Sequence, residues 1–284
     1  MKIALLGSTG MLGSKTLEVF KKAGHELLAP NRFELNVSHL SEIEKYFNNY
    51  FFDILINCTG FTKVDACEDK ANASMALTVN GTAIGWLAQY CKATQRVLVH
   101  FSTDYVFDGE KSEPYQETDS THPINIYGET KREGEKLIME VNPFFYLIRT
   151  SWVFGSGGSN FVKTMVELLK TKTKIEVVTD QVGGPTYTND LARFILELID
   201  QRAKYGLYHF ANEGYTSWNG FAQEIKRLTG SACEIIPALS ANFTRPAKRP
   251  ANSRFDLSKA SQAVGHRPRP WQEALEEYLT KELK

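Results

Sequence analysis

Short apolar runs alternate with amphipathic segments along the first half of the chain. The runs predict buried strands at 2–6, 26–29, 53–57, 96–101 and 145–149. Between them, apolar residues recur at helical spacing and predict helices at 11–22, 40–47, a long stretch ending near residue 93, and 127–141. Strands that alternate with helices in this way favour a doubly wound α/β fold with a parallel sheet.

The pattern loosens after Thr150. Glycine-rich turns at 155–158 and 183–185 and a proline-rich basic stretch at 244–270 predict mainly loops, with one further helix at 191–199. No internal repeat or low-complexity linker separates the two halves. We therefore expect the second half to pack directly on the first and to return segments to its sheet.

Composition and charge argue against nucleic acid and membrane surfaces as binding partners. The 33 Lys and Arg residues balance the 33 Asp and Glu residues, so no global field draws the chain to nucleic acid or to a membrane surface. No stretch approaches the roughly 18 apolar residues of a membrane span, and a cytoplasmic location is expected. The four cysteines lack CxxC spacing, which predicts reduced and mostly buried thiols. The histidines show no metal-ligand spacing, so no metal is expected.

Three glycines follow the first predicted strand and open the first helix. Gly7, Gly10 and Gly13 form a GxxGxxG pattern in which helix amides and a positive dipole end can meet a dinucleotide pyrophosphate. The strand before and the helix after are the context that such a motif requires. We therefore expect a Rossmann-like dinucleotide-binding domain at 1–150 and a smaller α/β substrate-binding domain at 151–284, with a soft boundary.

The end of the second strand bears on the choice of cofactor. An acidic residue there would bind a ribose 2′-hydroxyl, but the chain has Arg32, which suits a 2′-phosphate. A solvated loop arginine is the competing interpretation. NADPH is therefore preferred, and NADH stays open.

A hydroxyl, a phenol and an ammonium group follow downstream. Tyr127 and Lys131 are four residues apart, hence on one face of a helix, where the lysine charge lowers the pKa of the phenol. Such a tyrosine can protonate a carbonyl oxygen as hydride arrives at carbon. Thr103 follows the strand at 96–101, at the edge where α/β sheets bind ligands, and can orient the carbonyl. Together they resemble the triad of extended short-chain dehydrogenases.

Five motifs make the resemblance more specific. They are STDYVFDG at 102–109, YGETK at 127–131, RTSWVF at 149–154, NFVKTM at 160–165 and DQVGGPT at 180–186. Over nearly the whole chain the sequence resembles the dTDP-4-dehydrorhamnose reductases. The resemblance implies reduction of dTDP-4-dehydro-L-rhamnose to dTDP-L-rhamnose with NADPH or NADH.

The resemblance also implies roles for individual residues. Tyr127 is the proton donor, Lys131 its electrostatic partner, and Thr103 and Asp104 contact the sugar. With the glycine loop, the residues expected at the cofactor are Gly7, Gly10, Met11, Leu12, Gly13, Arg32, Asn36, Gly60, Phe61, Thr62, Tyr127 and Lys131. The residues expected at the substrate are Thr62, Val64, Thr103, Asp104, Trp152, Arg249 and Asn252.

Some of these positions have competing interpretations. Asn36 stands where the family commonly has an aspartate near the adenine, and the run at 59–61 departs from a small-small-aromatic pattern; both concern cofactor preference more than chemistry. Trp152 can wall the sugar or base, or it can be a buried aromatic between the two domains. Four cations at 245–254, including Arg249, suit a sugar-nucleotide diphosphate, and a solvated basic surface is the alternative.

Other functions remain open at this point. The triad residues do not separate the rhamnose enzyme from reductases of other nucleotide-linked 4-ketosugars. The family also resembles the NADP-binding regulatory subunit of methionine adenosyltransferase, which is not catalytic, although the intact triad favours an enzyme. Simple reduction fits better than dehydration, because Tyr105 rather than a carboxylic acid follows Asp104. The sequence is compatible with a homodimer.

Overall fold

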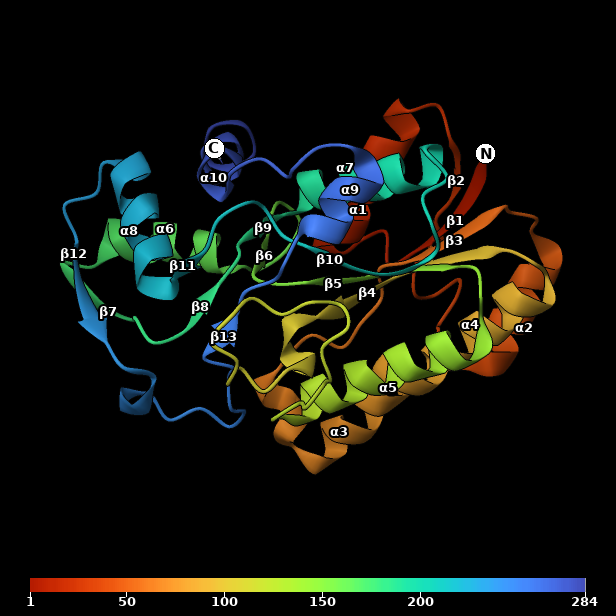
Figure 1. Ribbon diagram of the computed structural model, residues 1–284, viewed down its shortest axis with the longest axis horizontal. Helices are drawn as coiled ribbons and strands as arrows, with labels where there is room; N and C mark the ends of the chain where they lie inside the picture. Colours follow the sequence, from red (N-terminus) through yellow and green to blue (C-terminus); the bar gives the residue numbers. More distant parts are fainter. Residues whose placement is uncertain (284) are drawn as a thin grey trace.

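The computed structural model describes residues 1–283, so Lys284, the end of the expected second domain, lies outside the described residues. Six parallel strands form a central sheet in the order β10-β5-β4-β3-β1-β2 (Figure 1). The strands are β1 (Lys2–Leu6), β2 (Glu26–Leu28), β3 (Ile54–Asn57), β4 (Val97–Thr103), β5 (Phe145–Thr150) and β10 (Gly206–Phe210). β1 pairs with both β2 and β3, so the strand order reverses at the strand that precedes the glycine loop.

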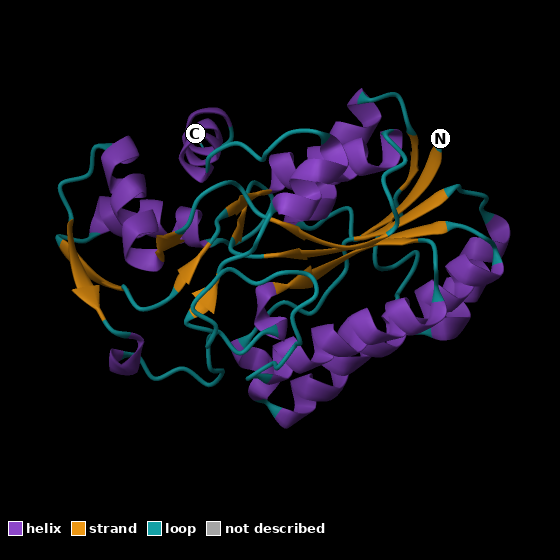
Figure 2. Cartoon of the chain, in the orientation of Figure 1, coloured by secondary structure: helices purple, strands orange, loops and turns teal. Residues whose placement is uncertain are grey.

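Helices cover both faces of this sheet (Figures 1 and 2). One face carries α1 (Met11–Lys22), α7 (Thr188–Asp200) and α9 (Ser258–Val264), whose apolar side chains join a core with β1, β3 and β5. The other carries α2 (Leu40–Asn49), α4 (Ala83–Ala93) and α5 (Ile126–Val141). The predicted doubly wound α/β fold is confirmed, because the apolar runs are strands buried on both faces.

Strand β4 is longer than predicted. The sequence ends this strand at Phe101, but Ser102 and Thr103 continue it by pairing with Arg149 and Thr150 of β5. The prediction ends at Phe101 because it relies on a run of apolar residues, and Ser102 and Thr103 carry polar hydroxyl side chains. Thr103 is therefore the last residue of β4 rather than part of a loop, and the strand itself fixes its position.

The long helical stretch before Ala93 is broken into four pieces. They are η1 (Asp65–Glu68), α3 (Lys70–Leu77), a π-helical turn η2 (Thr78–Thr82) and α4. In the π turn, the Asn80 side chain accepts from the Phe61 amide at 2.8 Å and donates to the Phe61 carbonyl at 3.0 Å. It also donates to the Thr130 hydroxyl of α5 at 3.1 Å. The turn thus ties the segment after β3 to the helix that carries Tyr127 and Lys131.

The prediction of mainly loops after Thr150 is wrong. Besides the predicted helix, which is α7, this half contains α9 and the helices α6 (Phe161–Thr171), α8 (Trp218–Thr229) and α10 (Trp271–Lys281), with the short 3-10 turn η4 (Ser240–Asn242). The additional strands are β6 (Val153–Phe154), β7 (Lys174–Val178), β8 (Val182–Gly183), β9 (Thr186–Tyr187), β11 (Thr216–Ser217), β12 (Glu234–Ala238) and β13 (Asn252–Ser253). Most of these strands are two residues long, which is too short for a periodic pattern to show.

The second half contributes to two cores. Phe154, Phe221 and Trp271 lie in a separate apolar core formed by α6, α8 and α10. By contrast, β10 pairs with β5 in the central sheet, and α7 packs on α1. Residues 188–210 therefore belong spatially to the first half. None of the helices within residues 1–283 is both long and apolar enough to cross a membrane.

Candidate active site

The glycine loop lies at the carboxyl end of β1. Gly7 has a φ of +75°, and a Cβ there would lie 2.8 Å from the backbone of Cys58. A Cβ on Gly13 would overlap the Gly7 carbonyl, so both positions require glycine. Helix α1 begins after Gly10 without a side-chain cap, which leaves its first amide groups available. The loop can therefore accept a pyrophosphate at a helix N-terminus.

A cavity of about 350 Å³ opens beside this loop. It is lined by six of the residues predicted to bind the cofactor, Gly7, Gly10, Arg32, Asn36, Gly60 and Phe61. Arg32 is exposed at the cavity, whereas the Asn36 side chain already accepts hydrogen bonds from the amide and hydroxyl of Ser38. Met11, Leu12, Gly13 and the exposed Thr62 are not among the lining residues.

Tyr127 and Lys131 occupy the first two turns of α5. Asn125 caps the start of the helix, and its side chain accepts from the Gly128 amide at 2.8 Å. A Cβ at Gly128 would overlap the Tyr105 carbonyl, so glycine lets the helix start approach the short helix η3 (Asp104–Val106). The exposed fraction is 8% for Tyr127 and 6% for Lys131. Both side chains therefore lie where bulk water is largely excluded.

Burial controls the titration of both groups. Burial and the Asp104 carboxylate raise the pKa of Tyr127, and the neighbouring Thr103 hydroxyl only partly opposes this. The predicted lowering of the phenol pKa by Lys131 is therefore wrong for the protein alone, because desolvation of the phenolate dominates. Burial lowers the pKa of Lys131 to about 8. The lysine donates to the Phe101 carbonyl at 2.6 Å, which holds it in place beside β4.

Thr103 and Asp104 stand at the end of β4. The Thr103 hydroxyl donates to Asp104 Oδ1 at 3.0 Å and accepts from the Tyr105 amide at 3.2 Å. Asp104 Oδ2 accepts from the Ser253 hydroxyl of β13 at 2.5 Å. Burial raises the pKa of Asp104 to about 6, despite the bonds from Ser253 and Thr103 that lower it. Sequence reasoning missed Ser253, because nothing local marks a serine 149 positions away as a partner of Asp104.

Mainly apolar side chains pack against the ring of Tyr127. Phe61 and Val64 pack in one cluster with Tyr127, together with Tyr105 and Ile126. The rings of Tyr105 and Tyr127 meet edge to face, with centroids 5.7 Å apart. Two of the predicted binding residues, Phe61 and Val64, are thus placed beside the predicted proton donor.

A second cavity, of about 490 Å³, is lined in part by Tyr105. Phe161, Trp218 and Phe243 give it aromatic walls, and its cations are Arg245 and Arg249. Trp152 does not line it directly but stacks on Trp218 with ring centroids 3.5 Å apart and planes at 7°. Trp152 has a φ of +49°, a left-handed conformation that is rare for a bulky residue. Sequence reasoning missed Trp218, whose position next to Trp152 depends on long-range packing.

The two substrate residues predicted in the basic stretch already have partners. Arg249 binds Asp65 through both terminal nitrogens, at 2.6 and 2.7 Å. The Asn252 amide donates to the carbonyls of Lys111 and Glu113, and its oxygen accepts from Arg254. Arg249 still lines the second cavity, but Asn252 does not. Arg245 also lies near Asp65, at 3.8 Å, but its side chain is 61% exposed, so it is the more available cation of that cavity.

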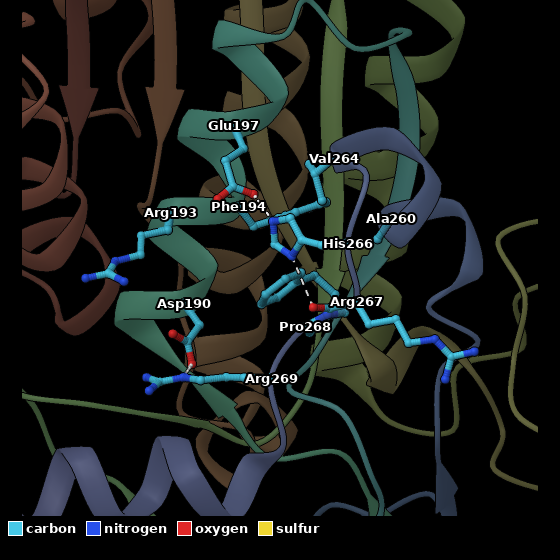
Figure 3. A pocket seen from close by; sticks show the side chains of 11 residues that line it. Asp190, Arg193, Phe194, Glu197, Ala260, Val264, His266, Arg267, Pro268 and Arg269 are labelled. Carbon is cyan, nitrogen blue, oxygen red and sulfur yellow. Dashed lines mark hydrogen bonds and ion pairs between the residues drawn. The ribbon is translucent and has the colours of Figure 1, made fainter.

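A third cavity, of about 230 Å³, is separate from every predicted site residue (Figure 3). It lies among α7, α9 and the segment 266–269. Arg269 forms an ion pair with Asp190 at 2.9 Å, and His266 lies 3.0 Å from Glu197. In Figure 3 the Arg267 side chain points away from the centre of the cavity. These contacts connect the second half to α7.

The cysteines match their prediction. All four are free thiols; Cys67, Cys91 and Cys233 are buried and Cys58 is half-buried. Burial raises the pKa of the Cys91 thiol to about 12, so it stays protonated. Over residues 1–283, no three His, Cys, Asp or Glu side chains gather in a metal-binding arrangement.

The model of the family described as "RmlD substrate binding domain" matches residues 1–284. The chain belongs to this family. Among curated members similar to the chain, the spore coat polysaccharide biosynthesis protein SpsK of Bacillus subtilis is 39% identical and covers 98% of this chain and 96% of its own length. A dTDP-4-dehydrorhamnose reductase of Aggregatibacter actinomycetemcomitans is 37% identical, over 96% of this chain and 97% of its own.

Solved structures agree with the RmlD assignment. A dTDP-4-dehydrorhamnose reductase of Clostridium acetobutylicum superposes with a TM-score of 0.94 at 39% identity, over 98% of each chain. The dTDP-4-dehydrorhamnose reductase of Bacillus anthracis, solved in complex with NADP, gives 0.92 at 33% identity, over 98% of each chain. The predicted resemblance is confirmed.

Proposed function

We propose that this RmlD-family protein reduces the 4-keto group of dTDP-4-dehydro-L-rhamnose to give dTDP-L-rhamnose, with NADPH as the preferred cofactor and NADH as an alternative. One observation carries the proposal. Thr103, Tyr127 and Lys131 are all buried near the carboxyl end of β4, and Phe61, which packs in one cluster with Tyr127, lines the cavity of the glycine loop. The reductases named above, one of them solved with NADP, support the same chemistry.

The chain's own residues account for the proton. When bound, the nicotinamide supplies a hydride to the carbonyl carbon. Tyr127, whose pKa burial raises, keeps its proton at neutral pH and can donate it to the carbonyl oxygen. The Lys131 ammonium stabilises the phenolate that forms as that proton leaves. Thr103 orients the carbonyl through its hydroxyl.

The remaining predicted residues divide between cofactor and substrate. We infer that Met11 and Leu12 join the glycines at the pyrophosphate, that Arg32 and Asn36 face the adenosine, and that Gly60, Phe61 and Thr62 lie nearer the nicotinamide. For the substrate, the inferred contacts are Thr62, Val64, Thr103, Asp104, Trp152 and Arg249, with the nucleotide in the aromatic cavity. Residues 1–150 then hold the cofactor, and the expected domain at 151–284 selects the sugar. A homodimer and a cytoplasmic location remain predictions.

The variant Tyr127→Phe tests the proposal. Oxidation of NADPH in the presence of the ketosugar falls by orders of magnitude, because only proton donation in the transition state is removed. Binding of NADPH, measured by fluorescence titration, stays within about twofold. Unchanged turnover in this variant contradicts the assigned role of Tyr127.

The sugar itself is tested separately. The wild-type protein is incubated with NADPH and a panel of dTDP-4-ketosugars, and the products are separated by chromatography. Consumption of dTDP-4-dehydro-L-rhamnose supports the proposal. Consumption of another ketosugar alone contradicts the named substrate but not the chemistry.

A further inference from the structure

A chain of buried polar side chains runs beneath the site from β3 to Lys131. It begins at Asn57, the last residue of β3, whose side-chain oxygen accepts from the Thr59 amide at 3.1 Å and from the Thr59 hydroxyl at 2.6 Å. A backbone amide can only donate, so the Asn57 atom that faces it must be the oxygen. The NH₂ group of Asn57 is therefore directed at the other neighbour, Nδ1 of His100, at 3.2 Å.

This orientation determines which nitrogen of His100 carries the proton. An NH₂ group can only donate, so Nδ1 must accept and the proton of a neutral imidazole lies on Nε2. The ring is neutral, because burial and the nearby Lys131 hold the pKa of His100 well below its usual range, which the Asn57 backbone carbonyl opposes only in part. Nε2 lies 3.3 Å from Lys131 Nζ. An imidazole N–H is therefore directed at the amine of Lys131.

We propose that Asn57 and His100 are positioning residues for Lys131: Asn57 fixes the Nε2–H tautomer of His100, and that N–H faces the lysine amine. The inference rests on the proposed function, which gives Lys131 its role. A neutral amine has a lone pair that can accept from Nε2–H, whereas an ammonium group has none. The contact therefore favours the neutral amine and acts in the same direction as burial, which lowers the pKa of Lys131 to about 8.

The charged groups around Lys131 do not cancel the effect of His100 on the pKa of the lysine. Glu135, one turn further along α5, raises the pKa of the lysine. Its carboxylate is occupied by Arg149 of β5, with contacts of 2.8 and 2.7 Å. Asp104, after β4, acts on Tyr127 and raises its pKa. His100 thus opposes Glu135, and the balance places the titration of Lys131 close to neutral pH.

Nitrogen-15 NMR of the histidine rings tests the tautomer in the wild-type protein. We expect His100 to show protonated Nε2 and bare Nδ1 at pH 9, where Lys131 is mainly a neutral amine, with its signals assigned by their loss in His100→Gln. His209 is an internal control with the opposite tautomer, because its Nδ1 faces the Tyr115 carbonyl, which can only accept. A protonated Nδ1 or an imidazolium at His100 overturns the proposal, whether or not the protein reduces a ketosugar.

The variant Asn57→Asp tests the effect on Lys131. The carboxylate keeps both bonds from Thr59 and offers its second oxygen to His100, so the ring proton moves to Nδ1 and Nε2 accepts from the lysine ammonium. Because the ammonium form is then favoured, the alkaline limb of the pH profile of hydride transfer moves up by about one pH unit. This shift corresponds to about tenfold more ammonium at a given pH above the limb.

A matched control separates this effect from that of any added carboxylate. Asn142 is another buried asparagine that accepts from a backbone amide, that of Phe144 at 2.9 Å. We expect Asn142→Asp to leave the His100 tautomer and the alkaline limb unchanged. A tautomer change in Asn57→Asp without movement of the limb, or an equal movement in Asn142→Asp, overturns the link to Lys131.

A second set of measurements applies if Asn57→Asp does not fold. The wild-type spectrum still decides the tautomer of His100. The variant His100→Gln then decides the link to Lys131: an alkaline limb at higher pH supports the link, and an unchanged limb overturns it. Absence of any reduction by the wild type counts against the proposed function alone.

Discussion

Replacing Asp104 by asparagine removes a carboxyl group that the fold buries at an energetic cost. The Asp104 side chain is 3% exposed, and burial raises its pKa from 3.8 to about 6. A rise of about two pKa units corresponds to about 3 kcal/mol of destabilisation once the carboxyl is ionised. Asparagine has nearly the same shape, and the Ser253 and Thr103 hydroxyls can rotate to suit it.

The direction in which stability changes with pH follows from the number of protons that the native and unfolded states bind. Between pH 4 and pH 6 the native state holds a proton on Asp104 that the unfolded state has released, so the free energy of unfolding of the wild type falls as pH rises. The side chain of Asp104→Asn does not ionise, so the free energy of unfolding of this variant does not show this fall. We expect the stability of the variant relative to the wild type to increase by about 2.5 kcal/mol between pH 4 and pH 8, measured by urea unfolding at each pH.

Asp108 provides a control of opposite sign. The Glu110 amide and the Tyr115 hydroxyl lower the pKa of Asp108, so Asp108→Asn should lose stability relative to the wild type as pH rises. Comparing each variant with the wild type across pH cancels any constant change in packing. A relative stability of Asp104→Asn that does not depend on pH refutes the argument that burial holds the proton on this carboxyl.

Three further predictions follow from the same geometry. Gly13→Ala forces a Cβ into the Gly7 carbonyl and should weaken NADPH binding at least tenfold, measured by fluorescence titration; affinity equal to the wild type contradicts the packing argument. Glu135→Gln leaves Arg149 as an uncompensated buried charge and should cost about 3–5 kcal/mol in urea unfolding, whereas a loss below 1 kcal/mol shows that water reaches the pair. Arg32→Ala should raise the KM for NADPH and not that for NADH; equal changes refute contact with the 2′-phosphate.

The sequence predicts best what depends on neighbours along the chain. The strand at Lys2–Leu6, the glycine loop after it and the helix from Met11 match the structure, because apolar runs and glycine spacing are local properties. Tyr127 and Lys131 share a helix, so their spacing alone brings them to one face. After Thr150 the sequence predicts α7 but not the other helices, whose apolar stripes lie among glycine and proline signals that favour loops.

Contacts between distant segments were not predictable in the same way. His100 lies within an apolar strand and suggests no chemistry by itself. Its tautomer depends on Asn57, 43 positions earlier, and its effect depends on Lys131, 31 positions later. Only the parallel pairing of β3 with β4, and the packing of α5 on β4, joins the three.

Arg249 shows why charge counting misleads at such a site. Four cations in ten residues predict an anion-binding loop, but Arg249 already binds Asp65, 184 positions away. An arginine that is bidentate to a carboxylate offers a diphosphate only the part of its charge that Asp65 leaves uncompensated. The pair instead fixes the basic loop against η1 and places the exposed Arg245 at the rim of the aromatic cavity. Arg245→Ala should therefore weaken binding of the sugar nucleotide more than it lowers stability, and Arg249→Ala should do the reverse.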